Sequence, residues 1–373
     1  MIYLDNGATS FPKPECVYRA TEEILRGYCA NPGRSVHDLA QRCAEEIYDT
    51  RCAVSDFFSL KGPERVCFAS NATDALNTVI KGVIKPGFTV FTTDAEHNSV
   101  LRPLYKLRDT IGVDLRIFPA DIDIYESIKT SQSIKPSVLV INLRSNVTGQ
   151  TQDLNTIKRI KDEFGITVIA DASQLAGHEN IDASMGFADF ICTSGHKGLF
   201  GIQGTGLLLI NSELKIDTLR EGGTGTETFN LSMPEFIPDR FEAGTQNVPG
   251  ILSIYHGISF LNEYGMDSVK GRINELTEML YERLSSVRGI RILGCEGGIS
   301  AFTLGKYNSE YVGTKLNEDG ICVRCGYHCA PLIHDRLRTK SSGAVRVSLS
   351  VFNRKYHLDR LYSSLKRIAE QTI

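Results

Sequence analysis

Residues 189–198 read DFICTSGHKG, and the prediction of the fold starts from this stretch. Its first five residues are mostly apolar or β-branched and end at a glycine-flanked turn, a pattern typical of a buried strand. The turn carries Lys197 between Gly195 and Gly198. A lysine in a turn is usually solvated, so its meaning depends on which other side chains reach the same edge of the sheet.

On both sides of this stretch, short β-branched runs alternate with helical patterns, which indicates βαβ units and a largely parallel sheet. The predicted strands are 65–69, 89–92, 137–142, 167–170, 189–193 and 206–210, and the clearest helices are 73–84 and 153–164. We therefore expect a doubly wound α/β domain. Ligands of such a domain bind beyond the carboxyl ends of the strands.

The pattern changes in the last third of the chain. Residues 221–250 are rich in Gly, Pro and Thr and too long for an ordinary connection, which predicts a functional loop. The segments that follow are one long helical span over 250–287, short strands near 290–304 and 345–349, and a helix over 355–370. They predict a small α+β domain. The expected division is a large domain over 15–250 and a small domain made of 1–14 and 251–373.

Composition narrows the class of protein. Lys plus Arg number 41 against 44 Asp plus Glu, and the charges are not gathered in one tail, so neither nucleic acid nor an anionic membrane is an expected partner. The chain shows no leader pattern at its start and no apolar run long enough to span a membrane. We expect a soluble, cytoplasmic protein whose ten cysteines are reduced.

Polar residues gather at the predicted strand ends. Thr73 can hold an anion at a helix N-terminus, although helix capping is the commoner role for such a residue. Asp171 is either a cap or a buried carboxylate with a cationic partner, and by itself the sequence leaves both open. Because these residues, Asn146 and the Lys197 turn share one edge of the sheet, they can converge on a crevice. An acid, a phosphate cup and an amine are what a pyridine cofactor needs.

With these residues in place, the chain resembles the class V aminotransferase family over almost its whole length, within it the branch of cysteine desulfurases and selenocysteine lyases, compact-loop (group II) type. The matching segments are YLDNGATS (3–10), ANPGRSVH (30–37), SNATDALN (70–77), DAEHNSV (94–100), SNVTG (145–149), DASQLAG (171–177), TSGHKG (193–198), RFEAGTQN (240–247), GYHCAP (326–331) and RVSLSVFN (346–353). The resemblance implies a PLP-dependent transferase of fold type I, with a mainly parallel seven-stranded sheet and a small α+β domain.

The resemblance also implies roles around pyridoxal 5'-phosphate (PLP). Lys197 corresponds to the Schiff-base lysine, which later moves a proton at the substrate α-carbon. Asp171 corresponds to the carboxylate that keeps the pyridine nitrogen protonated, and Gln174 to the side chain that bonds the phenolic oxygen. His97 corresponds to the imidazole stacked on the ring, with a role in proton transfer.

Further positions follow from the same resemblance. The phosphate cup comprises Thr73, Ser194 and His196, together with Thr245 from the other subunit of a homodimer. Asn146, which also lies at the cofactor, and Arg346 correspond to the pair that grips the carboxylate of an amino-acid substrate, where a planar guanidinium makes a bidentate contact.

The family places the desulfurase nucleophile on a loop of the small domain, where this chain has Cys329. Its thiolate attacks the substrate sulfur or selenium, which leaves alanine and an enzyme persulfide, and neighbouring His328 is expected to assist ionisation. A rival interpretation is a metal or cluster site, since Cys322, Cys325 and Cys329 have ligand-like spacing with His328 and His334 nearby. We expect no metal, because the family has none here. Cys325 is either a small core residue or a resolving thiol.

Two departures from the family pattern leave the substrate open. Ala72 stands where many desulfurases have a second hydroxyl, and residues 222–236 differ from those of the better-studied enzymes. Cysteine, selenocysteine and cysteine sulfinate are all compatible, and a sulfur or selenium acceptor protein is a possible partner. The alternatives are a β-elimination lyase such as cysteine lyase, an aminotransferase, or a non-catalytic scaffold that retains the fold.

Overall fold

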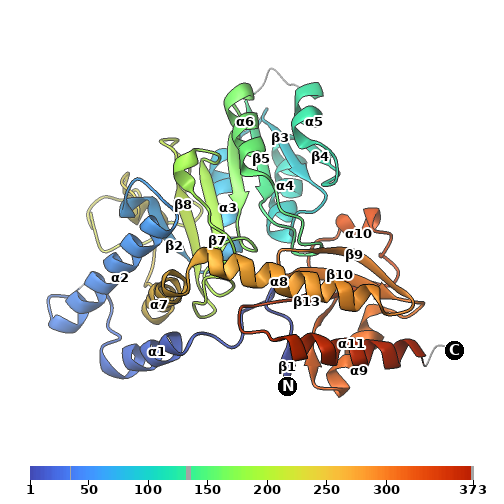
Figure 1. Ribbon diagram of the computed structural model, residues 1–373. Coiled ribbons are helices and arrows are strands. Elements are labelled where there is room, and N and C mark those ends of the chain that lie inside the picture. Colours follow the sequence, from blue (N-terminus) through green and yellow to red (C-terminus); the bar gives the residue numbers. More distant parts are fainter. Residues whose placement is uncertain (34, 132–135, 371–373) are drawn as a thin grey trace.

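A seven-stranded sheet forms the centre of the molecule in the computed structural model, which describes residues 1–33, 35–131 and 136–370 (Figure 1). The strand order is β2-β8-β7-β6-β5-β3-β4. The strands are β2 (Val66–Ala69), β3 (Thr89–Thr93), β4 (Asp114–Phe118), β5 (Ser137–Asn142), β6 (Thr167–Asp171), β7 (Phe190–Ser194) and β8 (Gly206–Ile210). Within this sheet β8 alone runs in the direction opposite to the other six strands. The predicted α/β class with a mainly parallel sheet is confirmed.

Helices cover both faces of this sheet, and side chains along each strand alternate between two cores. On β5, Leu139 and Ile141 pack in one hydrophobic cluster, whereas Val138 and Val140 pack in the other. Strands buried on both faces are expected of a largely parallel sheet. The helices before and within this part of the chain are α1 (Glu15–Gly27), α2 (Asp38–Phe57), α3 (Ala72–Val83), α4 (Asn98–Ile111), α5 (Ile124–Thr130) and α6 (Leu154–Phe164).

Local sequence explains where these helices begin and end. The Asp153 carboxylate accepts hydrogen bonds from the backbone N–H groups of Asn155 and Thr156 at the start of α6. Gly165 ends the helix in the left-handed region, with φ of 62°. An Asp cap and a terminal glycine are strong helix boundaries, which is why the prediction over 153–164 is confirmed nearly to the residue.

A second, four-stranded sheet in the order β12-β13-β10-β9 belongs to the C-terminal part. Its strands are β9 (Ile290–Glu296), β10 (Ile299–Leu304), β12 (Arg324–Gly326) and β13 (Ala344–Ser348). Near it, β1 (Ile2–Tyr3) pairs in parallel with β11 (Ile321–Cys322), which joins the N-terminus to this part of the molecule. The helices here are α9 (Ser309–Glu318), α10 (Ile333–Arg336) and α11 (Lys355–Glu370).

The single helical span expected over 250–287 is wrong. It consists of α7 (Val248–Tyr264), which packs against α1 and α2, and α8 (Met266–Ser285), which reaches across to β9 (Figure 1). The break falls at Gly265, whose backbone has φ of 84° and ψ of 125°. Since the apolar pattern continues on both sides, the sequence shows the break only as one glycine that leaves the helical region.

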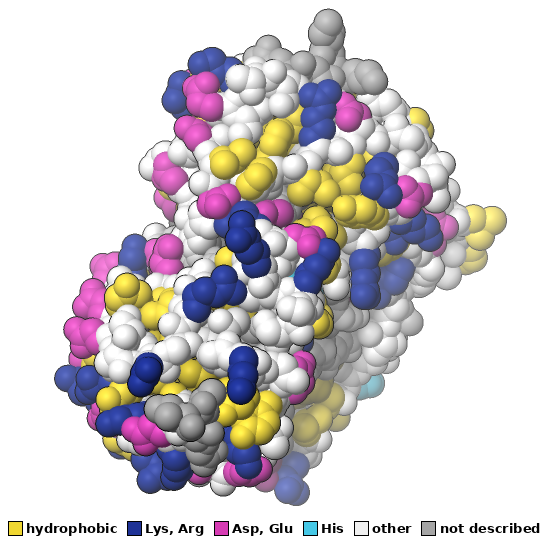
Figure 2. Space-filling model, turned by 90° about the vertical axis from the view of Figure 1, so that its right-hand side faces the viewer, with side chains coloured by type: hydrophobic (Ala, Val, Ile, Leu, Met, Phe, Trp, Pro, Cys, Tyr) yellow, Lys and Arg dark blue, Asp and Glu magenta, His cyan; other side chains and the backbone are white. Residues whose placement is uncertain are grey.

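Charges of both signs are interspersed over the face shown in Figure 2, with small apolar groups between them. This agrees with the nearly balanced charges of the sequence. None of the helices described is long and apolar enough to cross a membrane.

Candidate active site

A pocket lies beyond the carboxyl ends of the parallel strands and contains most of the residues singled out from the sequence. Its lining comprises Asn71, Ala72, Thr73, His97, Ser99, Asn142, Arg144, Asn146, Asp171, Ser173, Gln174, Ser194, His196 and Lys197. Five strands therefore deliver polar side chains to one place, as expected for an α/β sheet. The convergence predicted from the strand ends is present.

Lys197 lies in the turn that follows β7, with its side chain mostly buried in this pocket. The turn is held from the N-terminal segment, because the Ser10 hydroxyl donates to the Lys197 carbonyl at 2.7 Å. Burial lowers the pKa of the Lys197 ammonium to about 8, and the nearby Asp171 carboxylate opposes that shift. A lysine with a lowered pKa is a better nucleophile near neutral pH.

Asp171 closes β6 and is held by the residue two positions on. Its Oδ1 accepts from the backbone N–H of Ser173 at 2.9 Å and from the Ser173 hydroxyl at 2.5 Å. Gln174 lines the same pocket and donates from Nε2 to the Gly7 carbonyl at 2.9 Å. The N-terminal segment thus touches both the lysine turn and the glutamine.

Glu96 is a second buried carboxyl group close to Asp171. Its Oε1 accepts from the Thr93 hydroxyl at 2.8 Å and from the Asn142 backbone N–H at 3.1 Å. Burial raises the pKa of Glu96 to about 8, and the charge of Asp171 adds to that rise. At neutral pH Glu96 is mainly protonated, so it does not add a second negative charge beside Asp171.

A chain of hydroxyl groups connects the predicted phosphate cup to His97. The Thr73 and Ser99 hydroxyls are 2.8 Å apart, and the Ser99 hydroxyl lies 2.7 Å from His97 Nδ1. Nδ1 also accepts from the Ser99 backbone N–H at 3.1 Å. Burial lowers the pKa of His97 to about 4, so the ring is neutral near pH 7. With Nδ1 as acceptor, the proton of that neutral ring is on Nε2.

Ser194 and His196 flank the other side of the predicted cup. Ser194 Oγ is buried and has no hydrogen-bond partner among the described residues. His196 contacts Thr9, with 3.0 Å between Nδ1 and the Thr9 hydroxyl, and burial lowers its pKa to about 4. A buried hydroxyl without a partner at a pocket wall indicates room for a polar ligand. The N-terminus of α3 opens on the same pocket and favours an anion there.

Thr245 is the predicted cup residue that does not line this pocket. It is exposed, and it lines a neighbouring cleft with Ser70 and Asn247. Its segment is anchored by Glu242, whose carboxylate accepts from the Phe68 backbone N–H at 2.6 Å and from Arg51 at 2.7 Å. The assignment of Thr245 to a partner's phosphate stays a prediction.

Arg346 and Asn146, the predicted carboxylate grip, are in contact. Arg346 is almost fully buried on β13, and its Nη1 donates to the Asn146 carbonyl at 3.0 Å. Its Nη2 pairs with Asp5 at 2.8 Å. The Asn146 side chain donates from Nδ2 to the His328 carbonyl at 2.7 Å, which ties it to the segment that bears Cys329.

Cys329 is exposed at the tip of the loop after β12, beside the pocket. Both His328 and Cys329 have backbone angles in the left-handed region, with φ of 52° and 57°. Non-glycine residues in this region carry local strain, which is typical of functional loops. The loop is nevertheless docked, because the Cys329 carbonyl accepts from the backbone N–H of Asn98, the first residue of α4, at 2.7 Å.

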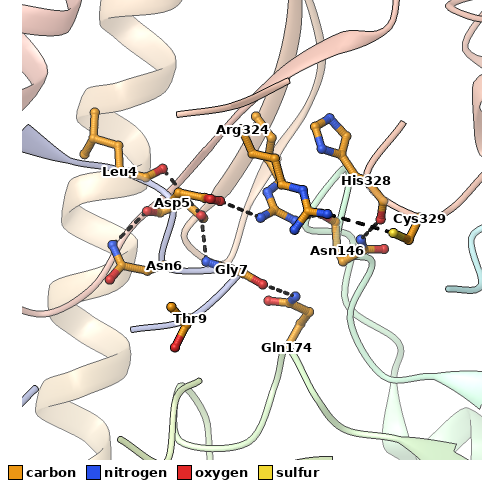
Figure 3. Close-up of polar contacts among 12 residues, drawn as sticks. Leu4, Asp5, Asn6, Gly7, Thr9, Asn146, Gln174, Arg324, His328 and Cys329 are labelled. Atoms are coloured by element: carbon orange, nitrogen blue, oxygen red, sulfur yellow. Dashed lines mark hydrogen bonds and ion pairs between the residues drawn. The ribbon is translucent and has the colours of Figure 1, made fainter. Parts of the chain in front are cut away.

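The cation next to the sulfur is Arg324, whose Nη2 lies 3.8 Å from Cys329 Sγ (Figure 3). The expectation that His328 assists the thiol is wrong for this structure. The His328 ring points away from Cys329 in Figure 3, and its Nε2 lies 3.2 Å from the Ala344 carbonyl. Burial lowers the pKa of His328, so the ring is neutral and supplies no positive charge. A guanidinium at this distance can donate a weak hydrogen bond to the sulfur and orient it.

Cys325 lies on β12, and its side chain faces helix α9. It pairs with Val345 across the strands, and its sulfur lies so close to Gly313 of α9 that a Cβ at that position would overlap it. Burial raises the pKa of the Cys325 thiol to about 11. Within the described residues, no three His, Cys, Asp or Glu side chains are arranged to hold a metal ion. The close packing of its sulfur against Gly313 favours Cys325 as a core residue.

Four residues that sequence reasoning missed are Asp5, Glu96, Ser99 and Arg324. Asp5 lies in the segment YLDNGATS, and Glu96 and Ser99 lie on either side of His97 in DAEHNSV. The segments were therefore recognised, but the contributions of these three side chains were not. Arg324 had no usable signal in the sequence. Its position opposite residue 346 follows only from the pairing of β12 with β13, and β12 is too short to be recognised.

Curated relatives and solved structures resemble the chain over nearly its full length. A probable cysteine desulfurase of Methanothermobacter thermautotrophicus is 31% identical, with 99% of this chain and 94% of the relative covered. A cysteine desulfurase of Escherichia coli is 29% identical over 99% of this chain and 93% of its own. The apo structure of cysteine desulfurase from Thermococcus onnurineus superposes with a TM-score of 0.92 at 27% identity, covering 99% of this chain and 95% of that one.

The family model for aminotransferase class-V matches residues 2–361. Members of that family use PLP, and the pocket residues suit that group. Lys197 offers a mostly buried amine, Asp171 a carboxylate, and Ser194 a buried hydroxyl without a partner among the described residues. The chain therefore belongs to the aminotransferase class-V family.

Proposed function

We propose that this chain is a PLP-dependent cysteine desulfurase or selenocysteine lyase of the compact-loop type. It would convert L-cysteine or L-selenocysteine to L-alanine and transfer the sulfur or selenium to Cys329. The observation that carries the proposal is the exposed Cys329 sulfur beside the lysine pocket, 3.8 Å from the Arg324 guanidinium. An aminotransferase needs no thiol at this position.

The residues of the chain divide the work of this reaction. When bound, PLP supplies an electron sink for charge that develops on the substrate. Lys197 holds the cofactor and moves a proton at the substrate α-carbon. We assign Asp171 to the pyridine nitrogen and Gln174 to the phenolic oxygen, and neutral His97, with its proton on Nε2, would lie against the ring. The phosphate is assigned to Thr73, Ser194 and His196.

Cys329 performs the step that sets the product. Its thiolate attacks the substrate sulfur, a new S–S bond forms, and the substrate C–S bond breaks. The electron pair of that bond stays with the β-carbon, which takes up a proton to become the methyl group of alanine. The balance is enzyme thiol plus cysteine giving enzyme persulfide plus alanine, with no outside oxidant. Arg324, with Nη2 3.8 Å from Sγ, is proposed to orient the attacking sulfur.

Arg346 and Asn146 are proposed to bind the α-carboxylate of the substrate. The buried guanidinium retains N–H groups that are not engaged by Asp5 or Asn146, and Nε has no partner among the described residues. A planar guanidinium with unused donors suits a carboxylate. The site also connects substrate to nucleophile, because Asn146 holds the carbonyl of His328, the residue before Cys329.

A homodimer is part of the proposal. Thr245 is exposed and lies outside the lysine pocket of its own chain. The buried pair of Arg51 and Glu242 holds this segment in place, so Thr245 can be presented to a second copy of the chain.

The sulfur on Cys329 would pass to an acceptor protein or a reductant, for which the exposed loop tip is suited.

The direct test is product analysis of the PLP-loaded protein with L-cysteine and, side by side, L-selenocysteine, in the presence of a reductant. We expect equal amounts of alanine and sulfide or selenide, and loss of the cysteine reaction in Cys329→Ser with cofactor binding intact. Cys16→Ser, which changes another exposed thiol, is the matched control. The relative rates identify the preferred element, and adding cysteine sulfinate tests the third candidate.

Other outcomes identify the alternatives. Pyruvate and ammonia in place of alanine would establish a β-elimination lyase and overturn the desulfurase proposal. Amino-group transfer to a keto acid would establish an aminotransferase. A colourless protein that takes up no added PLP would indicate a scaffold that retains only the fold.

A further inference from the structure

The ion pair of Arg346 with Asp5 is the starting point. Arg346 is 1% exposed, and its Nη2 lies 2.8 Å from Asp5 Oδ1. A buried guanidinium without a counter-charge is costly, so the pair stabilises the site before any substrate enters. The same carboxylate competes with any anion that approaches this guanidinium.

A second arginine increases the importance of Asp5. Arg324 lies directly opposite Arg346 in the antiparallel pair of β12 and β13, so the two side chains share one face of the sheet. Like charges directly opposite one another are unfavourable. Within the described residues Arg324 forms no ion pair with an acidic side chain, whereas Arg346 pairs with Asp5. Of these two opposed arginines only Arg346 has an acidic partner among the described residues, and the unpaired positive charge of Arg324 favours an anion at this site.

Asp5 is fixed by its neighbours in the N-terminal segment. The Ser348 backbone N–H donates to the Leu4 carbonyl at 2.8 Å, and the Ser348 hydroxyl accepts from the Gly7 N–H at 2.7 Å. Gly7 itself lies against the guanidinium, since a Cβ there would be 3.2 Å from Arg346 Cζ. Figure 3 shows Asp5 pointing toward the guanidinium groups, with Gly7 beside Gln174. The carboxylate and the glycine thus bracket Arg346.

We propose that Asp5 is a positioning residue for substrate binding: it holds Arg346 by one nitrogen, leaves its other N–H groups to the substrate carboxylate, and weakens carboxylate binding by sharing the guanidinium. This deepens the proposed function and rests on it, because that function assigns the carboxylate to Arg346. Weakened binding suits a site that must release alanine. The N-terminal segment therefore sets the affinity for both substrate and product.

The test compares propionate, which has a carboxylate but neither amine nor thiol, with neutral propionamide, by calorimetric titration of the full-length PLP-loaded protein. In Asp5→Asn we expect propionate to bind about tenfold more tightly, because a competing negative charge is removed, with propionamide unchanged. The unliganded variant should also melt at a lower temperature. If Asp5→Asn does not fold, Asp5→Ser offers a neutral hydroxyl acceptor and carries the same expectation.

Two controls separate the possible failures. Asp319→Asn breaks the surface pair with Arg367 and should leave propionate binding unchanged. Arg346→Gln should abolish the preference for propionate over propionamide. Unchanged or weaker propionate binding in Asp5→Asn, with that preference lost in Arg346→Gln, overturns the inference alone. Retention of the preference in Arg346→Gln overturns the carboxylate role of Arg346 in the proposed function.

Discussion

The turn that holds Lys197 and the loop that holds Cys329 differ in burial and in backbone conformation. The lysine turn continues a buried strand, lies in a pocket and is braced by the N-terminal segment. The cysteine loop follows a strand of three residues, has left-handed backbone at His328 and Cys329, and exposes its sulfur. Burial lowers the pKa of the lysine, whereas the cysteine sulfur contacts a nearby arginine. A deep site suits a retained cofactor, and an exposed tip suits a group that must leave.

The largest effect is expected from replacing the buried lysine. The wild type should show a visible cofactor band that borohydride reduction abolishes, and Lys197→Ala should lack that band. Lys197→Ala should also lower the turnover of L-cysteine by about 10³-fold or more. Absorbance spectra and alanine release measure both. Lys158→Ala, on an exposed face of α6, is the control. Full turnover in Lys197→Ala would show that the lysine turn is not the cofactor site.

The pH dependence of stability sharpens the same point. The folded-state pKa of Lys197 is lowered to about 8, so the unfolded chain binds more protons between pH 8 and the ordinary lysine value. This group therefore destabilises the cofactor-free fold fully below about pH 8, and the penalty disappears as pH rises toward 10.5. Lys197→Met should stabilise the cofactor-free protein at pH 7 by on the order of 3 kcal/mol.

Urea unfolding of wild type and Lys197→Met at pH 7 and at pH 10 measures this penalty. The advantage of the methionine variant should shrink at the higher pH. An advantage that stays constant between the two pH values would assign it to packing and not to the buried charge.

The cysteine side of the comparison is sharpened by Cys325, the neighbour that behaves like a core residue. Gly313→Ala should destabilise the protein by about 2 kcal/mol, because the added methyl overlaps the Cys325 sulfur. Cys325→Ala in the same chain should restore most of that loss. Thermal unfolding measures both, and Cys325→Ser should keep persulfide formation at Cys329. Loss of that persulfide would make Cys325 a participating thiol.

The smallest effect concerns Arg324. Arg324→Gln should slow alkylation of Cys329 by iodoacetamide at pH 7 about tenfold, because the guanidinium that contacts and orients the reacting sulfur is removed. Exposed Arg338, in the same segment, provides the control Arg338→Gln. Peptide mapping of the alkylated cysteine gives the rate. An unchanged rate would show that the contact at 3.8 Å does not influence the thiol.

The two regions also differ in how far the sequence predicts them. Apolar runs that end in polar turns predicted six of the seven sheet strands and the convergence of Thr73, Asp171 and Lys197, because burial on both faces leaves a strong pattern. The edge strand β4, reading DLRIF, was missed because it is only half buried. The antiparallel direction of β8 was also missed, although the helix-free link over 195–205 is shorter than a parallel crossover requires.

Around Cys329, the sequence located the nucleophile by resemblance but not its surroundings. The orientation of His328 depends on a left-handed backbone that no local pattern encodes. The contact of Arg324 and the pair of Asp5 with Arg346 depend on strand pairing between distant segments. Long-range pairing of short strands leaves almost no signal in a single sequence, which is why these partners required the structure.

The central claim is that Cys329 receives the atom removed from the substrate. Intact-protein and peptide mass spectrometry after one round of reaction with L-cysteine, without reductant, tests it most directly when alanine is counted in the same sample. The account predicts one added sulfur on the peptide that contains Cys329 for each alanine released, and none in Cys329→Ser. Alanine release without sulfur on Cys329, or sulfur released as sulfide together with pyruvate, would contradict it.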